Sequence, residues 1–496
     1  MKRSSGVLMP IFSLPSKYGI GTLGKEAYKF VDFLVDTKQS YWQMLPIMET
    51  SFGNSPYSAT SSFAGNPFFI DFEMLKNDGL LKESDYSYLD NDENPRRVDY
   101  KKQFDNKDKV LRIACNNFKH LYTKELNTFF DEYKFFLDDY AIFYALKNKH
   151  NGGSFDVWEN DYKLKKADAI NNFIKENEDE IEFYKIVQCL FYRQWFKLKK
   201  YANSKGIKII GDTPIYSAYD SAEVWANPEF FHLDANKKPI DVAGCPPDGF
   251  CDKGQLWGNP LYNYDYIKKD NYKYFINKFS HLLNLYDVLR IDHFRGFDSY
   301  YAIPHGSPDA TGGKWVKGPG IELFNELKKC LGDVNIVVED LGFLTDSVRN
   351  LLKETGFPGM KVMEFAFNAY DKGNTEYLPH TYPENSVAYL GTHDNDTFMG
   401  WINSIRKEDR DYAIEYLKLK EPSEYYKEAL QVLYNSKSNL VVVQFQDILG
   451  TGSIGRINAP ATLSEMNWSY RLLPYELDDN AKQFLKDLTV KNNRGQ

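Results

Sequence analysis

The sequence has few cysteines: Cys115, Cys189, Cys245, Cys251 and Cys330, an odd number that is widely spaced. None of them forms a Cys-x2-Cys pair, so the pattern argues against a disulfide framework and against a structural zinc site. Such sparse cysteines are typical of a reducing compartment, and we therefore expect a cytoplasmic protein.

Long apolar runs and long basic runs are also missing. No stretch approaches the roughly 18 apolar residues that a membrane helix needs. The apolar run after the basic start at 1–5 is short and contains Pro10, so we expect no signal peptide. Lys and Arg number 61 against 69 Asp and Glu, a net charge of −8. This acidic balance argues against nucleic acid or an anionic membrane as the main partner.

What the sequence does contain is a recurring unit, a short apolar run that ends in a polar residue and is followed by a helical stretch. The clearest runs lie at 207–211, 288–291, 336–338, 361–365, 387–390 and 440–445. Runs that are apolar throughout suit parallel strands buried on both faces. Helical patterns lie between them, as at 27–35 and at 180–203, the latter ending near Gly206, a suitable left-handed cap. The alternation predicts an α/β fold with a parallel sheet.

Four acids each follow one of these runs: Asp212, Asp292, Glu339 and Asp394. In a parallel barrel the carboxyl ends of the strands meet on one face, which is where barrel enzymes place their active sites. Any single acid in such a position could instead cap the next helix. Four together, with unusual neighbours, favour a shared site.

The neighbours suggest distinct roles for three of these acids. Arg290 lies two residues before Asp292, so a strand would place both on the same face and the guanidinium would keep the carboxylate ionised, as a nucleophile requires. Glu339 leaves an apolar strand near other acids, which predicts a raised pKa and suits a general acid/base. Asp394, beside His393, suits the holding of sugar hydroxyls. Together these are the groups of a retaining glycosidase.

Two other uses of these residues stay open. A divalent metal could take His293, His393, Asp394 and Asp396, although no two histidines stand at paired ligand spacing and an arginine would repel the ion. The glycine patterns at 19–24 and 450–455 match a dinucleotide-binding motif, but each lacks half of the strand–turn–helix context. A nicotinamide-dependent barrel reductase is therefore an alternative with little support.

Over residues 5–468 the sequence resembles the amylomaltases, the 4-α-glucanotransferase family related to the α-amylase group. The shared blocks include Gly-Asp-Thr-Pro-Ile-Tyr at 211–216 and Gly-Gln-Leu-Trp-Gly-Asn-Pro-Leu-Tyr at 254–262. The others lie at 13–15, 18–24, 55–58, 63–67, 246–248, 289–296, 337–342, 356–362, 391–397 and 456–462. The sequence departs from the family pattern in minor places, at Gly249, Cys251 and Ile457. These departures bear on loop shape and acceptor preference.

The resemblance implies a (β/α)8 TIM barrel with helical insertion subdomains that transfers α-1,4-glucan segments by retaining double displacement, without a cofactor or metal. By family pattern Asp292 is the nucleophile, Glu339 the acid/base and Asp394 the transition-state stabiliser. Tyr57 is the expected stacking platform on the donor side and Trp257 that on the acceptor side. The substrate-binding set is completed by Asp212, Gln255, Arg290, His393 and Asn458.

The same resemblance sets the expected organisation and partners. We expect one catalytic barrel over 1–496, a mostly helical insertion at 75–200 between early barrel strands, and a substrate-loop insertion at 243–262. The partners would be α-1,4-glucans and maltooligosaccharides, as donors and acceptors. The protein itself would be a monomer or weak homo-oligomer. An α-glucan hydrolase with the same acids and a catalytically silent glucan-binding protein are the remaining alternatives.

Overall fold

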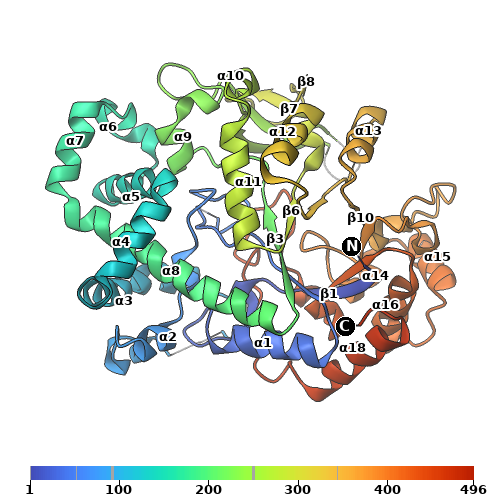
Figure 1. Ribbon diagram of the computed structural model, residues 1–496. Coiled ribbons are helices and arrows are strands. Elements are labelled where there is room, and N and C mark those ends of the chain that lie inside the picture. The colour runs from blue at the N-terminus through green and yellow to red at the C-terminus, as the bar shows by residue number, and fades with distance from the viewer. Residues whose placement is uncertain (1, 52, 91–93, 248–251, 343, 496) are drawn as a thin grey trace.

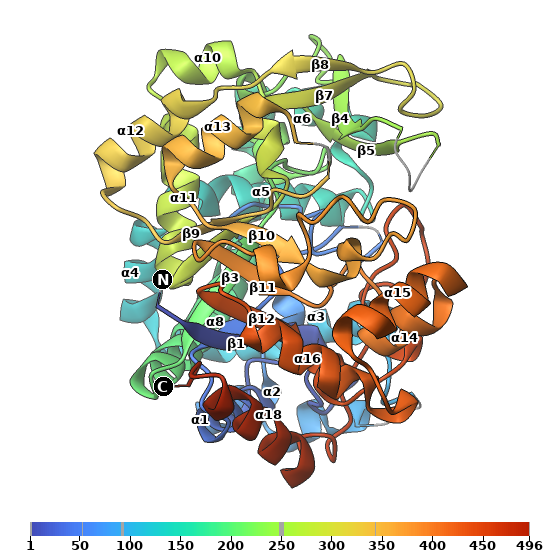
Figure 2. The ribbon, with the colours of Figure 1, turned by 90° about the vertical axis from the view of Figure 1, so that its right-hand side faces the viewer.

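The computed structural model describes residues 2–51, 53–90, 94–247, 252–342 and 344–495 (Figure 1). Its centre is an eight-stranded parallel sheet in the order β10-β11-β12-β1-β2-β3-β6-β9. The outer strands β9 and β10 lie next to each other, and the Val338 N–H donates to Pro358 O at 3.1 Å, so the sheet is nearly closed into a barrel. Both chain ends lie near β1 in Figures 1 and 2. The strands are β1 (Ser4–Leu8), β2 (Tyr41–Gln43), β3 (Lys208–Thr213), β6 (Val288–Ile291), β9 (Ile336–Val338), β10 (Gly359–Val362), β11 (Ser386–Tyr389) and β12 (Leu440–Gln444).

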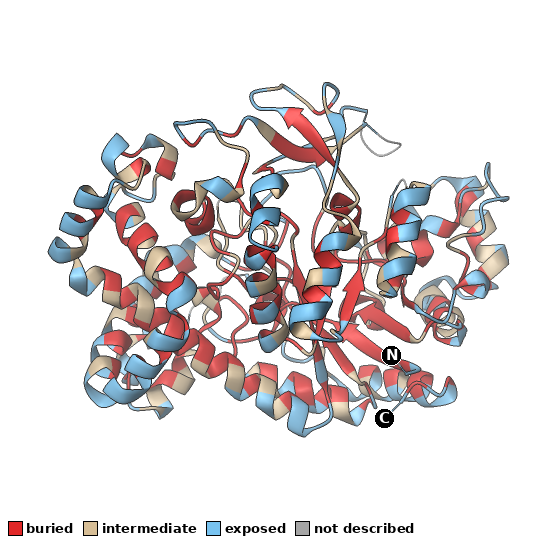
Figure 3. Cartoon of the chain, turned by 45° about the horizontal axis from the view of Figure 1, so that its top comes forward, coloured by how far each residue is buried: buried red, intermediate tan, exposed pale blue. Residues whose placement is uncertain are grey.

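The barrel strands are buried because helices cover the outside of the sheet (Figure 3). These helices bury one apolar stripe and expose the opposite face, as amphipathic helices do. The covering helices include α1 (Lys25–Asp36), α8 (Glu178–Ser204), α11 (Lys273–Leu285), α12 (Ile321–Leu331), α13 (Asp346–Thr355), α14 (Phe398–Ser404), α16 (Tyr425–Asn435) and α18 (Asp479–Lys491).

The predicted α/β fold with a parallel sheet is confirmed, and each predicted apolar run contains or overlaps a barrel strand. The run at 361–365 is only partly a strand, since β10 ends at Val362 and a 3-10 turn follows. The first two strands were not predicted. β1 is rich in Ser and Gly, and β2 has only three residues, so neither shows a continuous apolar run. The predicted helix at 180–203 is α8, and Gly206 has the expected left-handed φ of +84°.

A group of helices fills the chain between β2 and β3, on the left of Figure 1. The long helix α8 joins this group to the barrel, because it contacts α5 at one end and α1 at the other. Phe191 of α8 packs so closely against Gly65 that a Cβ on Gly65 would lie 2.0 Å from its ring. The other helices are α2 (Phe72–Asn77), α3 (Tyr100–Leu121), α4 (Thr123–Glu132), α5 (Lys134–Lys149), α6 (Asn160–Lys163) and α7 (Ala167–Glu176).

A second, antiparallel sheet of four strands lies at the top of Figure 2, in the order β5-β4-β7-β8. Its strands are β4 (Asp241–Cys245), β5 (Gln255–Pro260), β7 (Ser299–Pro304) and β8 (Lys314–Lys317). Trp257, expected in a loop, therefore lies on strand β5. The Gly and Pro content suggested a loop, but this segment pairs with β4 as a strand. An irregular register between Val242 and Gly244 accommodates its Gly and Pro residues. Gly249 and Cys251 lie outside the described residues.

Among the described helices, none combines the length and the apolarity that a membrane span requires.

Candidate active site

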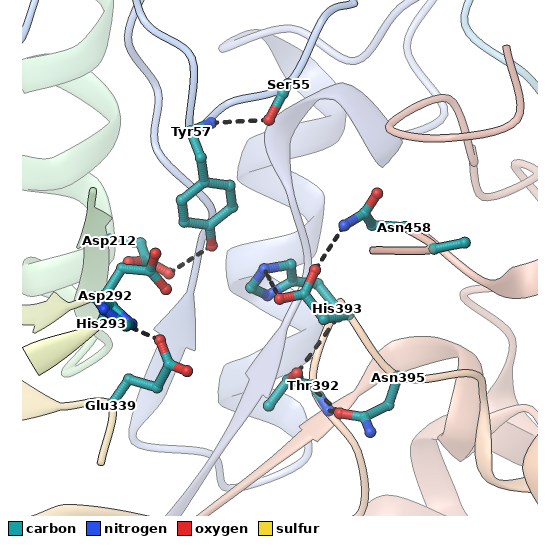
Figure 4. Close-up of polar contacts among 12 residues, drawn as sticks. Ser55, Tyr57, Asp212, Asp292, His293, Glu339, Thr392, His393, Asn395 and Asn458 are labelled. Carbon is teal, nitrogen blue, oxygen red and sulfur yellow. Dashed lines mark hydrogen bonds and ion pairs between the residues drawn. The ribbon is translucent and has the colours of Figure 1, made fainter. Parts of the chain in front are cut away.

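The barrel brings the four predicted acids to the same edge of the sheet. Asp212 is the fifth residue of β3, and the parallel register places it directly beside Arg290 of β6. Asp292 and Glu339 each come immediately after a strand, β6 and β9, which are neighbours in the sheet. Asp394 follows β11, and its chain neighbour His393 lies across the site from Asp212, Asp292 and Glu339 (Figure 4).

Arg290 is the centre of the arrangement, since its buried guanidinium contacts three carboxylates. Nη1 donates to Asp212 Oδ2 at 2.5 Å and to Asp292 Oδ1 at 3.0 Å, and Nη2 donates to Glu339 Oε2 at 3.4 Å. The remaining donor, Nε, lies 3.4 Å from Met360 Sδ. Such a buried charge cluster is tolerable because each ion has a partner of opposite sign. Arg290 therefore fixes the relative position of all three acids.

Asp292 and Glu339 share the guanidinium of Arg290, so the charge of each affects the pKa of the other. Burial and the charge of Glu339 raise the pKa of Asp292. Burial also acts on Glu339, but Arg290 and hydrogen bonds from Asp292 and from the His293 N–H, the latter at 2.8 Å, outweigh it and hold the pKa of Glu339 at about 2. Burial thus disfavours the charged form of Asp292, while the donors around Glu339 favour the charged form of that carboxyl.

The direction of the Glu339 shift differs from the sequence prediction, which expected a raised pKa for this acid. Desolvation was the only effect considered for Glu339. The structure adds donors to its Oε2 atom, the His293 N–H and the second nitrogen of Arg290. A carboxylate that accepts such bonds has its charged form stabilised, which lowers its pKa.

Asp394 is held in a polar pocket on the opposite side. Its Oδ1 accepts a hydrogen bond from Asn458 Nδ2 at 2.6 Å, and its Oδ2 lies 3.4 Å from His393 Nε2. The side chain is nevertheless 44% exposed, so it stays accessible to a ligand in the mouth of the barrel. Burial lowers the pKa of His393, which keeps its ring neutral at physiological pH.

Tyr57 joins the two sides of the site. Its hydroxyl donates to Asp212 Oδ2 at 2.9 Å, and its ring stacks on that of His393 with centroids 5.1 Å apart and planes 12° apart. Trp468, which no sequence pattern had singled out, packs against both rings at 5.8 and 5.9 Å. The expected sugar platform is therefore placed beside the acids, with its orientation fixed by two aromatic neighbours.

Trp257 and Gln255 lie at the other rim, on β5. The indole is 36% exposed, and its Nε1 donates to Gln255 Oε1 at 3.0 Å. Its ring meets His293 edge to face, with centroids 4.9 Å apart. Since the N–H of His293 binds Glu339, the exposed indole is connected to the acid/base candidate through a single residue.

His293 itself was considered from sequence only as a metal ligand, and the structure places it differently. Its backbone is left-handed, with φ 49° and ψ 50°, which turns its N–H toward Glu339. Strained backbone of this kind is common at functional sites. Sequence shows that His293 follows Asp292 but carries no signal for this conformation. Among the described residues, no group of three or more His, Cys, Asp or Glu side chains is arranged to hold a metal ion.

Two further buried acids lie beneath the turn that carries Asp394. The Glu364 carboxyl fills the space next to Gly391, where an added Cβ would lie 2.9 Å from Oε1. Asp447 follows β12 and accepts the Phe398 N–H at 2.7 Å. Burial and the nearby Asp447 raise the pKa of Glu364, and burial raises the pKa of Asp447 to about 7. Burial therefore disfavours the charged form of both acids beneath the turn.

Replacing Asp447 with asparagine should change how stability depends on pH. The folded-state pKa lies above the ordinary value of 3.8, so the stabilising contribution is complete below pH 4 and is lost as the pH rises through about 7. Asparagine stays neutral and still accepts the Phe398 N–H. The melting temperature of Asp447→Asn relative to wild type should rise by about 2–5 °C between pH 4 and 7 and then level off. Thermal unfolding monitored by circular dichroism measures this, and a pH-independent difference would contradict it.

The chain is similar to known proteins in sequence and in structure. A family model described as 4-alpha-glucanotransferase matches residues 9–476. A 4-alpha-glucanotransferase of Clostridium butyricum is 46% identical over 465 residues, covering 93% of this chain and 95% of the relative. One from Streptococcus pneumoniae (strain ATCC BAA-334 / TIGR4) is 44% identical over 492 residues, covering 99% and 97%.

Solved structures give the same result. The amylomaltase from Streptococcus agalactiae in complex with acarbose matches with a TM-score of 0.97 and 42% identity, and the match covers 100% of both chains. The amylomaltase from Corynebacterium glutamicum matches with a TM-score of 0.79 over 98% of this chain and 75% of that one. At 18% identity this second match shows a shared fold alone.

Proposed function

The chain belongs to the 4-alpha-glucanotransferase family, glycoside hydrolase family 77, and it is a 4-alpha-glucanotransferase. From this premise we propose which residue performs each part of the reaction. Asp292 attacks the anomeric carbon of the donor while Glu339 gives its proton to the departing glycosidic oxygen. The bond between the anomeric carbon and that oxygen breaks, and a covalent glycosyl–Asp292 ester forms. Asp394 binds the sugar hydroxyls as the ring flattens.

The second step reverses the first with a new sugar. Glu339, now a carboxylate, takes the proton of the 4-hydroxyl of an acceptor glucan, whose oxygen attacks the anomeric carbon. The ester bond breaks and Asp292 leaves as a carboxylate. The observation that carries this assignment is the Asp292–Glu339 pair, which two neighbouring strands bring onto one arginine.

The first step needs Asp292 ionised and Glu339 protonated. Both carboxyl groups lie on the guanidinium of Arg290, so a change of charge on one is felt by the other. Positive charge that develops at the anomeric carbon favours the ionised form of Asp292. At the same time the glycosidic oxygen becomes the acceptor for a protonated Glu339. Substrate therefore favours the protonation states that the first step needs.

We also propose the expected substrates and setting. Donors and acceptors are α-1,4-glucans and maltooligosaccharides, and acarbose, bound by the Streptococcus agalactiae amylomaltase, should compete with them. The chain acts as one catalytic unit over 1–496, with a helical insertion at 75–200 and a substrate-binding insertion at 243–262. It works in the cytoplasm, as a monomer or weak homo-oligomer. The unpaired thiols of Cys115, Cys189 and Cys330 support a reducing environment.

Product analysis from maltotriose tests the transfer assignment directly. A transferase makes glucose together with oligosaccharides longer than maltotriose, whereas a hydrolase makes only shorter sugars. A catalytically silent binding protein makes neither. Chromatography of the early products, with the total sugar balanced against reducing ends, distinguishes these outcomes.

Replacing Trp257 with alanine should lower the ratio of transfer to hydrolysis by about tenfold, because sugar–aromatic stacking that favours an acceptor over water is lost. Trp257→Phe keeps a ring and should retain most of the ratio. Leu256→Ala is the matched control: Leu256 is the preceding residue on β5 and is 44% exposed. If Trp257→Ala left the ratio unchanged, or if Leu256→Ala lowered it equally, the indole would serve only in packing.

A further inference from the structure

The turn that carries Asp394 is joined to a second loop, residues 453–458, by hydrogen bonds from both backbone and side chains. The Asn458 N–H donates to His393 O at 3.1 Å, and Asn458 Nδ2 donates to Asp394 Oδ1 at 2.6 Å. The two segments are more than 60 residues apart in sequence. The position of Asp394 is thus set by a loop that supplies none of the catalytic acids.

Arg456 is the residue that ties these contacts together. Its Nη2 donates to the backbone oxygen of Asp394 at 2.9 Å, and its Nε donates to the backbone oxygen of Asn458 at 2.7 Å. One rigid guanidinium therefore grips the main chain of both partners in the Asn458–Asp394 hydrogen bond. A planar fork with fixed donor directions suits this task, whereas a lysine could replace only one bond at a time.

The surroundings of Arg456 explain why the charge can stay there. Glu364, Asp396 and Asp447 form a buried or half-buried acidic group under the same turn, and Arg456 interacts favourably with Glu364. Both Glu364 oxygens are buried and make no hydrogen bond within the part of the chain that the structure describes. The charge of Arg456 therefore acts on the buried Glu364 carboxyl as well as on the two backbone oxygens that it binds.

We propose that Arg456 is a positioning residue for glycosyl transfer, which holds Asp394 and Asn458 together in the geometry that binds the flattened sugar ring. The proposal rests on the proposed role of Asp394 in the transition state. Arg456 acts only through these two residues. Its contribution should be expressed when the sugar distorts, because hydrogen bonds from Asp394 strengthen at that point.

Removing the guanidinium should therefore affect kcat more than KM. Arg456→Ala is expected to lower kcat for maltotriose disproportionation about 10- to 100-fold, with KM changed less than about threefold. Arg456→Lys should retain an intermediate rate, because one of the carbonyl contacts can re-form. Added guanidinium ion should restore part of the activity of Arg456→Ala. It should not raise the activity of the wild type.

The matched control is Arg97, which also donates to main-chain oxygens, one within the loop 453–458 and one after it. Its Nη2 donates to Ile454 O at 2.8 Å and its Nη1 to Met466 O at 3.4 Å, and within the described part of the chain it forms no hydrogen bond with Asp394 or Asn458. Arg97→Ala should therefore keep kcat within about threefold of the wild type. Thermal unfolding of all variants checks that the fold is retained.

The outcomes separate this proposal from the one on which it rests. Normal kcat in Arg456→Ala, or an equal loss in Arg97→Ala, overturns the positioning role of Arg456. Absence of guanidinium rescue together with an unchanged Arg456→Lys rate also overturns it. Asp394→Asn is measured alongside: if that variant keeps the wild-type rate, the assignment of Asp394 fails, whereas an inactive Asp394→Asn beside a normal Arg456→Ala refutes only the inference about Arg456.

Discussion

Replacing Asp292 with asparagine is expected to lower kcat for maltotriose disproportionation by about 10⁴-fold or more, the largest effect of any single substitution in this protein. An amide cannot form the glycosyl ester, so double displacement has no first step. Asparagine has nearly the same shape and keeps an oxygen for Arg290 Nη1, so the fold should survive. The rate is measured by glucose release and by the appearance of longer oligosaccharides.

A suitable control lies at the other end of the same strand. Asp287 precedes β6 and accepts hydrogen bonds from the Ile209 N–H and from Asn203 Nδ2, both at 2.8 Å. Asp287→Asn makes the same chemical change at the amino end of β6, far along the strand from the site. It should alter stability without abolishing transfer. An Asp292→Asn variant that disproportionates maltotriose at the normal rate would falsify the assignment of the nucleophile.

Replacing Glu339 with glutamine should cost about 10³-fold in kcat on maltotriose, since a glycosidic oxygen leaves poorly without a proton. A donor with fluoride as the leaving group needs little acid assistance. With α-maltosyl fluoride, release of the first equivalent of fluoride should stay within about tenfold of the wild type. The later steady rate should remain slow because the base for the second step is missing. A nucleophile variant would lose both phases.

The pH profile gives a second measurement on the same pair. In the wild type kcat/KM should fall on the alkaline side, where Asp292 and Glu339 lose the proton that they share. Glutamine cannot ionise, so this limb should be absent or displaced in Glu339→Gln. Asp340→Asn serves as the neighbouring control, because Asp340 is buried and binds the Met360 N–H at 2.6 Å rather than facing the site. If Glu339→Gln lost as much rate with α-maltosyl fluoride as with maltotriose, an acid/base role for Glu339 would be ruled out.

Local patterns were enough to predict most of the barrel and to place the candidate acids near one another. Apolar runs identify strands that are buried on both faces, and parallel strands present their carboxyl ends on one side of the sheet. Asp292 and Glu339 follow such runs directly, so their convergence was predictable. β1 and β2 escaped prediction because Ser, Gly and a three-residue length remove the pattern on which recognition depends.

The sequence by itself determined the kind of chemistry: which carboxylates, arginine and histidines are present, in what order, and on which strand ends. Only the tertiary structure decided how they share charge. The charged form of Glu339 is stabilised because the N–H of the left-handed His293 and the guanidinium of Arg290 both donate to it. Likewise Asp394 owes its position to Arg456, from a distant loop. Chain order records none of these distances, and pKa values and side-chain orientation depend on burial and on charges a few ångströms away.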